Sequence, residues 1–339
     1  MFGRAVDDRV ASAVTWRFTA LLAVVAAAAG ASLLVGGSSL SPHEVTTALA
    51  HPSAGGIANT IVWQLRMPRV CIAAVVGACL ALSGAMLQGM LRNPLVDPYL
   101  TGVSAGSAAA IAIAVLAGVA APFTPAIGFV AGLGAALLVA ALARRGSGID
   151  ANRLILAGVS LSALFASIVT LAIVRAQSND YASAIVAWLA GSMAGRGWHD
   201  LAATAPYAAA GMLLSLWVAG PLNALRVGDV RARSVGVDVD RAQWTILASS
   251  SLLAASSVVL AGMVGFIGLI VPHVARRLVG SDARALVPAC VCIGASLCML
   301  ADAICRTIVA PAELPIGVLL AFIGVPAFLY LYLRGERAR

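Results

Sequence analysis

About ten long apolar stretches follow one another along the chain, separated by short segments rich in arginine, glycine, proline and aspartate. A helix that crosses a bilayer needs about 20 such residues, because its backbone polar groups must be satisfied internally. The pattern predicts an all-α polytopic membrane protein with about ten transmembrane helices in one domain, residues 1–339. The stretches are 16–36, 68–91, 97–118, 122–143, 152–175, 198–219, 241–262, 263–279, 285–305 and 314–333.

The composition excludes a large soluble domain and an ATP site. Hydrophobic residues make up 61% of the chain and charged residues 11%, and ten spans take up roughly 200 of its residues. All 22 basic residues are arginine, so the lysine of a phosphate-binding loop is missing. The first apolar stretch is longer than the core of a typical signal peptide, and we expect it to be a retained span. The chain is therefore expected not to be an enzyme by itself.

The arginines divide unevenly between the two sides of the predicted topology. If the N-terminus is cytoplasmic, 17 of the 22 arginines fall inside. Such a bias is typical of cytoplasmic loops and supports an even number of spans, with both termini in the cytoplasm. The net charge of +8 is attributed to the same cytoplasmic loops, so binding to nucleic acid is not expected. The five arginines left outside are Arg66, Arg69, Arg175, Arg196 and Arg306.

Two connections exceed a simple turn. The outer segment 176–197 contains an apolar piece, 184–189, which predicts a small helix near the interface. The inner segment 220–240 is polar and punctuated by glycine, and connections of this length usually carry a function. Small residues such as Gly102 and Gly106 recur one turn apart, which favours close approach of helices in the membrane.

Three outer arginines, Arg66, Arg69 and Arg306, call for an explanation on a protein that keeps most of its arginine inside. One interpretation is snorkelling of the side chains to the interface. The other is docking of an acidic partner on the outer face. Asp302 lies one turn before Arg306, and this spacing predicts an ion pair that holds the guanidinium.

The inner turn after the second span contains Asn93 and Pro94 in the sequence Leu-Arg-Asn-Pro-Leu-Val-Asp-Pro. Its two prolines make it stiff and non-helical. It is either a plain tight turn or part of an inner gate.

Two other classes of function remain open from the residues alone. Gly102–Gly106 matches G-x-S-x-G, and His273 and Asp302 complete a serine hydrolase triad on paper, although the strand-to-helix turn is missing. Asp302 is also the one candidate for ion coupling in a secondary transporter. The four histidines form no metal-binding pair, and the six cysteines read as packing residues.

Several ordered blocks of the chain resemble the FecCD/BtuC-like permeases, the membrane subunits of type II ABC importers for vitamin B12, haem and ferric siderophores. The resemblance covers nearly the whole chain. The blocks are 66–69, 77–84, 88–98, 102–106, 225–237, 265–273 and 313–317.

The resemblance implies an assembly in the bacterial inner membrane. Two copies of the chain surround a central pathway, two ATPase subunits bind ATP and Mg below, and a periplasmic binding protein docks above. The chain itself is expected to hold no cofactor and no metal. ATP binding then pushes on the 220–240 segment and switches access to the pathway.

The resemblance also assigns roles to individual residues. Arg66, Arg69 and Arg306 correspond to arginines that receive the binding protein, and Asn93 with Pro94 corresponds to the cytoplasmic gate. The residues that correspond to the coupling site for the ATPase are Arg226, Gly228, Asp229, Ala232, Val235 and Gly236. For the cargo, the resemblance favours haem or another iron chelate, with cobalamin as the alternative.

Overall fold

The computed structural model describes residues 2–36, 40–120, 123–146, 148–176, 178–310 and 312–336. Side chains are described within these ranges except for 2–15, 145 and 331–336. Arg337 and Arg339, which the charge count assigns to the cytoplasm, lie outside the described residues.

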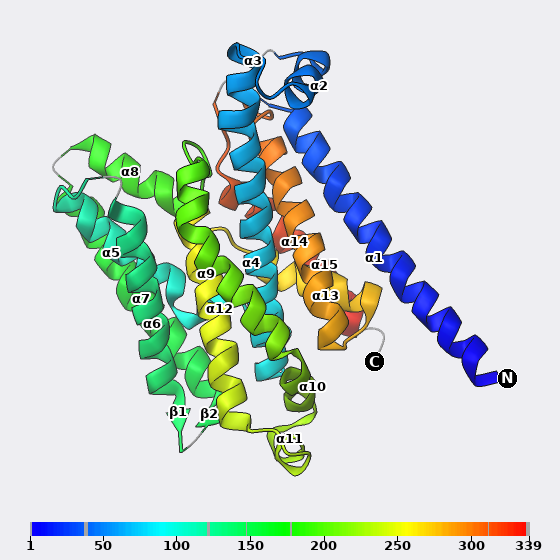
Figure 1. The fold of residues 1–339 in the computed structure, drawn as a ribbon. Helices are drawn as coiled ribbons and strands as arrows, with labels where there is room; N and C mark the ends of the chain where they lie inside the picture. Colours follow the sequence, from blue (N-terminus) through cyan, green and yellow to red (C-terminus); the bar gives the residue numbers. More distant parts are fainter. Residues whose placement is uncertain are drawn as a thin grey trace.

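Helices form nearly all of the regular structure, as the apolar pattern predicts (Figure 1). The first half contains α1 (Phe2–Leu34), α2 (Pro42–Ala50), α3 (Ile57–Thr60), the π-helix η1 (Ile61–Arg66), α4 (Met67–Leu91), the 3₁₀ helix η2 (Pro98–Thr101), α5 (Val103–Leu116), α6 (Thr124–Ala143) and α7 (Ala151–Arg175). The second half contains α8 (Asn179–Ala190), α9 (Trp198–Trp217), α10 (Ala219–Val227), α11 (Asp229–Ser234), α12 (Val239–Ala261), α13 (Ile267–Val279), α14 (Ala283–Cys305) and α15 (Ile316–Glu336). Among the described residues the only strands are β1 (Arg144–Arg145) and β2 (Gly148–Ile149), an antiparallel pair between α6 and α7.

Each of the ten apolar stretches contains a helix, but the helices differ in length. Six are long and apolar enough to cross a bilayer, and a seventh span results if α9 and α10, bent by 54°, count as one. The second crossing is longer than expected, because α3 and η1 continue into α4 and give an unbroken helical segment over Ile57–Leu91. α5 and α13 are shorter, with 14 and 13 residues.

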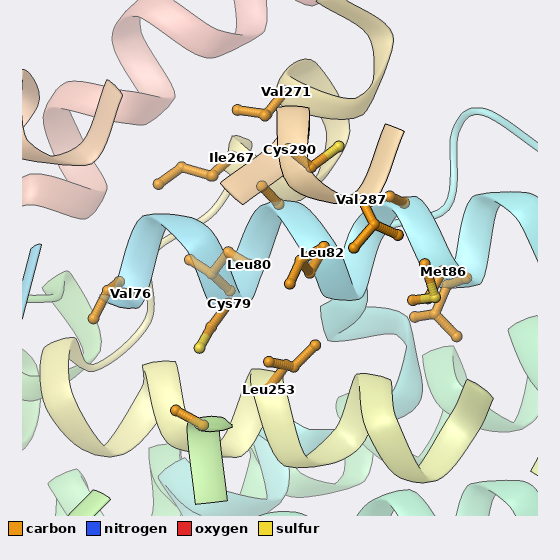
Figure 2. Close-up of a cluster of buried hydrophobic side chains, with 14 of the residues drawn as sticks. Val76, Cys79, Leu80, Leu82, Met86, Leu253, Ile267, Val271, Val287 and Cys290 are labelled. Atoms are coloured by element: carbon orange, nitrogen blue, oxygen red, sulfur yellow. The ribbon is translucent and has the colours of Figure 1, made fainter. Parts of the chain in front are cut away.

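The bundle is organised around α4, which is enclosed by α14, α12, α13 and α9 (Figure 1). Side chains from four helices meet around it in the cluster of Figure 2. Leu80, Leu82 and Met86 come from α4, Leu253 from α12 and Val287 from α14, and each is at most 2% exposed. This burial gives the core its van der Waals contacts, which drive helix association in a membrane.

The two ends of the bundle are distinct. One end, at the top of Figure 1, carries α2, α3 and α8, and we call it the α8 end. The opposite end carries the β hairpin, α10 and α11, and we call it the α11 end. α1 begins and α15 ends in the half nearer the α11 end.

Both connections that exceed a turn contain helices. Segment 176–197 holds α8, which confirms the predicted small helix. Segment 220–240 is mostly helical, forming α10 and α11 with a break at Gly228. Gly228 has a φ of +124°, a conformation that a residue with a Cβ rarely adopts.

Glycines bring α4 against its neighbours. A Cβ on Gly77 would collide with the Gly294 carbonyl of α14, and one on Gly84 would collide with the Gly268 carbonyl of α13. The close approach of helices that Gly102 and Gly106 predict is found between α5 and α6, because a Cβ on Gly106 would run into the Ala135 side chain. Backbones that approach this closely gain packing that lipid cannot supply.

Replacing Gly84 with alanine is expected to destabilise the protein by about 1–3 kcal/mol, because the added methyl group must push two helix backbones apart. The matched control is Gly134→Ala in α6, where the methyl group meets nothing within 4 Å. The measurement is the melting temperature of the purified protein in detergent. Equal melting temperatures for the two variants would show that the α4–α13 approach is not needed.

Candidate functional site

The three outer arginines lie together at the α8 end, and each is engaged inside the protein. Arg66 is 5% exposed and donates from Nη1 to the carbonyl oxygens of Leu33 (2.7 Å) and Leu34 (3.2 Å). Arg306 is also 5% exposed and donates from Nη2 to the carbonyl and hydroxyl oxygens of Ser32, both at 2.8 Å. All three acceptor residues belong to the last turn of α1.

These contacts cap the C-terminus of α1. The last carbonyls of a helix have no partner within it and carry the negative end of the helix dipole. The guanidinium groups of Arg66 and Arg306 therefore donate hydrogen bonds to these carbonyls and also place positive charge at the negative end of the dipole. Gly36 makes room for one of them, since its Cβ would lie 3.0 Å from the Arg66 guanidinium carbon.

Arg69 joins α4 to two acidic groups. Its Nε and Nη2 donate to the Asp302 carboxylate at 2.9–3.1 Å, and Nη1 and Nη2 donate to the Glu313 carboxylate at 2.9 Å. Asp302 also pairs with Arg306 at 3.1 Å, which confirms the predicted one-turn ion pair. Asp302 is 1% exposed, so one buried carboxylate serves the buried guanidinium of Arg306 and the partly exposed one of Arg69. We call Arg66, Arg69, Asp302, Arg306 and Glu313 the arginine cluster.

The arginine cluster goes beyond what the sequence analysis assigned. The three arginines and the Asp302–Arg306 pair were predicted, whereas the roles of Glu313 and of the end of α1 were not. A docking role for the arginines stays a prediction. Of the three, Arg69 has the most open surroundings, because its partner Glu313 is 38% exposed.

A second polar site lies at the α11 end, where α4 stops. Arg92 ends the helix with a left-handed φ of 53°. Asn93 folds onto its own turn, where its Oδ1 accepts from the Leu95 amide at 2.9 Å. A cavity of about 280 Å³ opens beside this turn. It is lined by Gln88, Gly89, Arg92, Asn93, Pro94, Arg226 and Arg276.

Gln88 holds the turn against α13. Its amide nitrogen donates to the carbonyl oxygens of Gly268 (2.9 Å) and Val96 (3.2 Å), and its oxygen accepts from Arg276 at 2.7 Å. Since Gln88 is only 3% exposed, its three contacts fix the position of the turn that contains Asn93 and Pro94.

The predicted coupling residues fall on both sides of the α10–α11 break. Arg226, in the last turn of α10, donates to the Ser281 carbonyl. Asp229, the first residue of α11, pairs with Arg92 at 3.4 Å. Ala232 is buried, whereas Val235 is 71% exposed and Gly236 follows it with a φ of +84°. Val230, which the sequence analysis did not name, is 83% exposed.

α10 is also fastened to the start of α14. Asn223 donates to the Asp282 carboxylate at 2.6 Å and accepts from the Ala283 amide at 2.8 Å. The Arg284 amide and the Asn223 side chain hold the pKa of Asp282 below its usual value. The α11 end thus links the end of α4, the two short helices and the start of α14.

The geometry does not support the alternative hypothesis of a serine hydrolase triad. Asp302, which a Ser104 triad would need as its orienting group, already serves Arg69 and Arg306 at the α8 end. Among the described residues no group of three histidine, cysteine, aspartate or glutamate side chains is placed to hold a metal ion.

Comparison with known proteins identifies the family of the chain. The model of the FecCD transport family matches residues 21–334. The chain is 37% identical to the cobalamin import system permease BtuC of Halobacterium salinarum over 303 residues, covering 87% of this chain and 80% of that one. It is 35% identical to the hemin transport system permease HmuU of Yersinia pestis over 291 residues, covering 83% and 86%.

A solved structure with the same fold is the inward-facing conformation of an ABC transporter described as of the metal-chelate type. It superposes with a TM-score of 0.83 at 32% identity, covering 93% of this chain and 98% of that one. The relatives are permease subunits rather than enzymes. The chain belongs to the FecCD transport family and is a multi-span permease of an ABC importer.

Proposed function

We propose that this permease moves haem or another iron chelate from the periplasm to the cytoplasm. The observation that carries the proposal is the match over 93% of the chain to a transporter of the metal-chelate type. The hemin permease of Yersinia pestis supports the same class of cargo. Cobalamin is the second candidate, because the permease of Halobacterium salinarum is similar over a comparable length. Both cargoes are bulky organic chelates of a metal.

We place the α11 end in the cytoplasm and the α8 end in the periplasm of a bacterial inner membrane, with ten spans and both termini inside. The arginines support this orientation. Those predicted to lie outside belong to helix ends at the α8 end, whereas Arg92, Arg226 and Arg276 line the cavity at the α11 end. An excess of arginine marks the cytoplasmic side.

The proposed assembly contains two copies of this chain, two ATP-binding subunits and a periplasmic binding protein. ATP and Mg are bound by the ATPase, and the permease holds no cofactor of its own. Val230 on α11 and Val235 directly after it present exposed apolar surface that suits a cleft on the ATPase. Force on α11 then reaches the end of α4 through the ion pair of Asp229 with Arg92, next to Asn93 and Pro94 at the gate.

On the opposite face, the arginine cluster is the proposed receiver of the binding protein. An incoming carboxylate can take the place of Glu313 at Arg69, because this side of the guanidinium has the more exposed partner. Arg66 and Arg306 then hold the end of α1 in the position that this contact requires.

Arg69→Gln is expected to weaken docking of the binding protein by about tenfold, which corresponds to about 1.4 kcal/mol for one lost charged contact. The matched control is Arg175→Gln, an exposed arginine at the end of α7 on the same face. Docking is measured by surface plasmon resonance on permease in nanodiscs. If both variants bind like the wild type, Arg69 has no docking role.

The function is tested by uptake into liposomes that contain the permease with its ATPase, supplied with the binding protein loaded with haem, a ferric siderophore or cobalamin. We expect ATP-dependent accumulation of an iron chelate, followed for haem by its Soret band. Accumulation of cobalamin alone would favour the second candidate. Uptake by the permease without an ATPase, driven by a proton gradient, would instead identify a secondary transporter.

A further inference from the structure

A cavity of about 510 Å³ opens on the side of the bundle between α6 and α9, near the α8 end. Both helices pack against α12, and Val259 of α12 lines the cavity. Phe129 of α6 and Tyr207 of α9 meet across it, with ring centroids 4.7 Å apart and the rings tilted by 46°. Its volume is in the range of about 300–1,000 Å³ that is usual for small-molecule sites.

The lining has a polar end and an apolar body. The polar end is formed by Arg196, which precedes α9, and by His199 and Asp200 in the first turn of α9. Arg196 donates to Asp200 Oδ1 at 3.1 Å, while the other carboxylate oxygen accepts from the Gly197 amide at 3.0 Å. The remaining lining residues are Pro125, Ala126, Phe129, Val130, Ala203, Thr204, Tyr207 and Val259.

The depth of the cavity matches one leaflet of a bilayer. Tyr207 lies seven residues beyond Asp200 on α9, which is about 10 Å along a helix axis. The hydrocarbon core is about 30 Å thick, so one leaflet contributes about 15 Å. The charged pair then lies at the head-group level and the two aromatic rings lie among the acyl chains. The cavity does not extend across the membrane.

The outer wall of the cavity is apolar and open. Val130 is 70% exposed and Tyr207 is 48% exposed. Exposed apolar side chains continue along both helices toward the α11 end, with Leu137 on α6 at 64% and Leu213 on α9 at 65%. In a chain that spans a bilayer, such a face contacts lipid.

We infer that this cavity binds a phospholipid whose head group carries both a phosphate and a primary ammonium, such as phosphoethanolamine. Arg196 has guanidinium donors left for the phosphate, because its contact with Asp200 uses Nη1. The Asp200 carboxylate accepts from the ammonium. An acyl chain of the same lipid lies along Phe129 and Tyr207. The inference requires only that the chain spans a bilayer and does not depend on the cargo.

The charged pair also predicts which head groups are disfavoured. A phosphoglycerol head is anionic and brings no cation to Asp200, so the carboxylate repels it. A phosphocholine head carries a cation with no N–H group, so it cannot donate a hydrogen bond to the carboxylate. Selectivity for the primary ammonium thus follows from Asp200, whereas Arg196 binds the phosphate that all three head groups share.

A second cavity provides a comparison within the same molecule. It has about 220 Å³ and lies between α6 and α12, nearer the α11 end. No charged residue lines it. It can accept an acyl chain but has no group that distinguishes one head group from another. Its lining residues are Leu133, Ala136, Leu137, Ala140, Trp244, Leu247, Ala248, Ser251 and Leu252.

The test is native mass spectrometry of the full-length permease after exchange into nanodiscs that contain equal amounts of phosphatidylethanolamine, phosphatidylglycerol and phosphatidylcholine. The wild type is expected to retain phosphatidylethanolamine about tenfold over the other two lipids, as one charged contact provides. Asp200→Asn should remove the preference, because its amide oxygen can still accept from the Gly197 amide while the charge that selects the ammonium is gone. Arg196→Gln should lower the retention of all three lipids, because each of them carries the phosphate. Ala203→Phe should abolish retention by filling the cavity.

The matched control for Ala203→Phe is Ala248→Phe, which places the same ring in the second cavity from an alanine that is also exposed. It should leave the preference for phosphatidylethanolamine unchanged. Equal retention of the three lipids by the wild type, or an unchanged preference in Asp200→Asn, would overturn the inference. So would cross-linking that finds a second copy of the chain seated between α6 and α9.

Discussion

Asp302→Asn is expected to lower the stability of the permease by about 3–5 kcal/mol, the cost of breaking a buried ion pair from one side. The substitution keeps the shape of the side chain and removes its charge. The guanidinium groups of Arg69, which is partly exposed, and Arg306, which is buried, then lose the carboxylate that they share, which lies 2.9 Å from the first and 3.1 Å from the second. The melting temperature of the purified protein is the measurement.

Glu313→Gln is the matched control for this change. It removes a carboxylate from the same Arg69 guanidinium, but Glu313 is 38% exposed and its pair is screened by water. A loss of less than about 1 kcal/mol is expected. Equal melting temperatures for Asp302→Asn and Glu313→Gln would show that the burial of Asp302 does not increase the stability that its ion pairs contribute.

A double substitution separates charge from packing. Adding Arg306→Gln to Asp302→Asn removes one of the two stranded positive charges, so part of the lost stability should return. Recovery will be incomplete, because Arg306 also donates to Ser32 at the end of α1. A double variant that is less stable by the sum of the two single losses would contradict the proposed charge balance.

The arginine cluster shows which contacts a sequence can predict. The Asp302–Arg306 pair follows from a one-turn spacing on a helix and was predicted. The Asp302–Arg69 pair joins positions 233 residues apart, and no spacing rule connects them. The contacts of Arg66 go to backbone carbonyls, which every residue carries, so no residue type marks the acceptor.

The same distinction applies to the fold. Hydropathy predicts a helix in each of ten stretches, because apolar side chains must face lipid or core. Hydropathy does not show where along a stretch the backbone departs from a helix. In the stretch 263–279, for example, only part of the backbone is helical. After Gly262, with a φ of +69°, the chain stays non-helical until Phe266, and α13 begins at Ile267. The resulting helix of 13 residues is shorter than the apolar run that encodes it.

At the α11 end, sequence and structure contribute different parts of the proposed site. The resemblance to known permeases indicated the stretch from Arg226 to Gly236. The structure shows which side chains of that stretch are available to a partner. Ala232 packs inward at 1% exposure, while Val230 and Val235 project outward. α11 has six residues and exposes Val230, and Val235 directly follows its last residue, so the two valines together form surface for a partner to cover.

Replacing both Val230 and Val235 with aspartate is expected to abolish ATP-dependent uptake and to weaken association with the ATPase at least about a hundredfold. Two carboxylates would have to be desolvated in the contact, and each costs more than a kilocalorie. The fold should survive, since the two side chains are 83% and 71% exposed. Association is measured by biolayer interferometry on permease in nanodiscs, and uptake is measured in liposomes.

Ile57→Asp is the control for this double change, because Ile57 is 79% exposed at the opposite end of the bundle, in the first turn of α3. It introduces a charge on an equally open apolar position and should leave ATPase association unchanged. Loss of association in both variants would indicate a general effect of added charge. Normal association of the Val230 and Val235 variant would exclude α11 as the contact and direct the search to the exposed side of α10, where Val227 is 59% exposed.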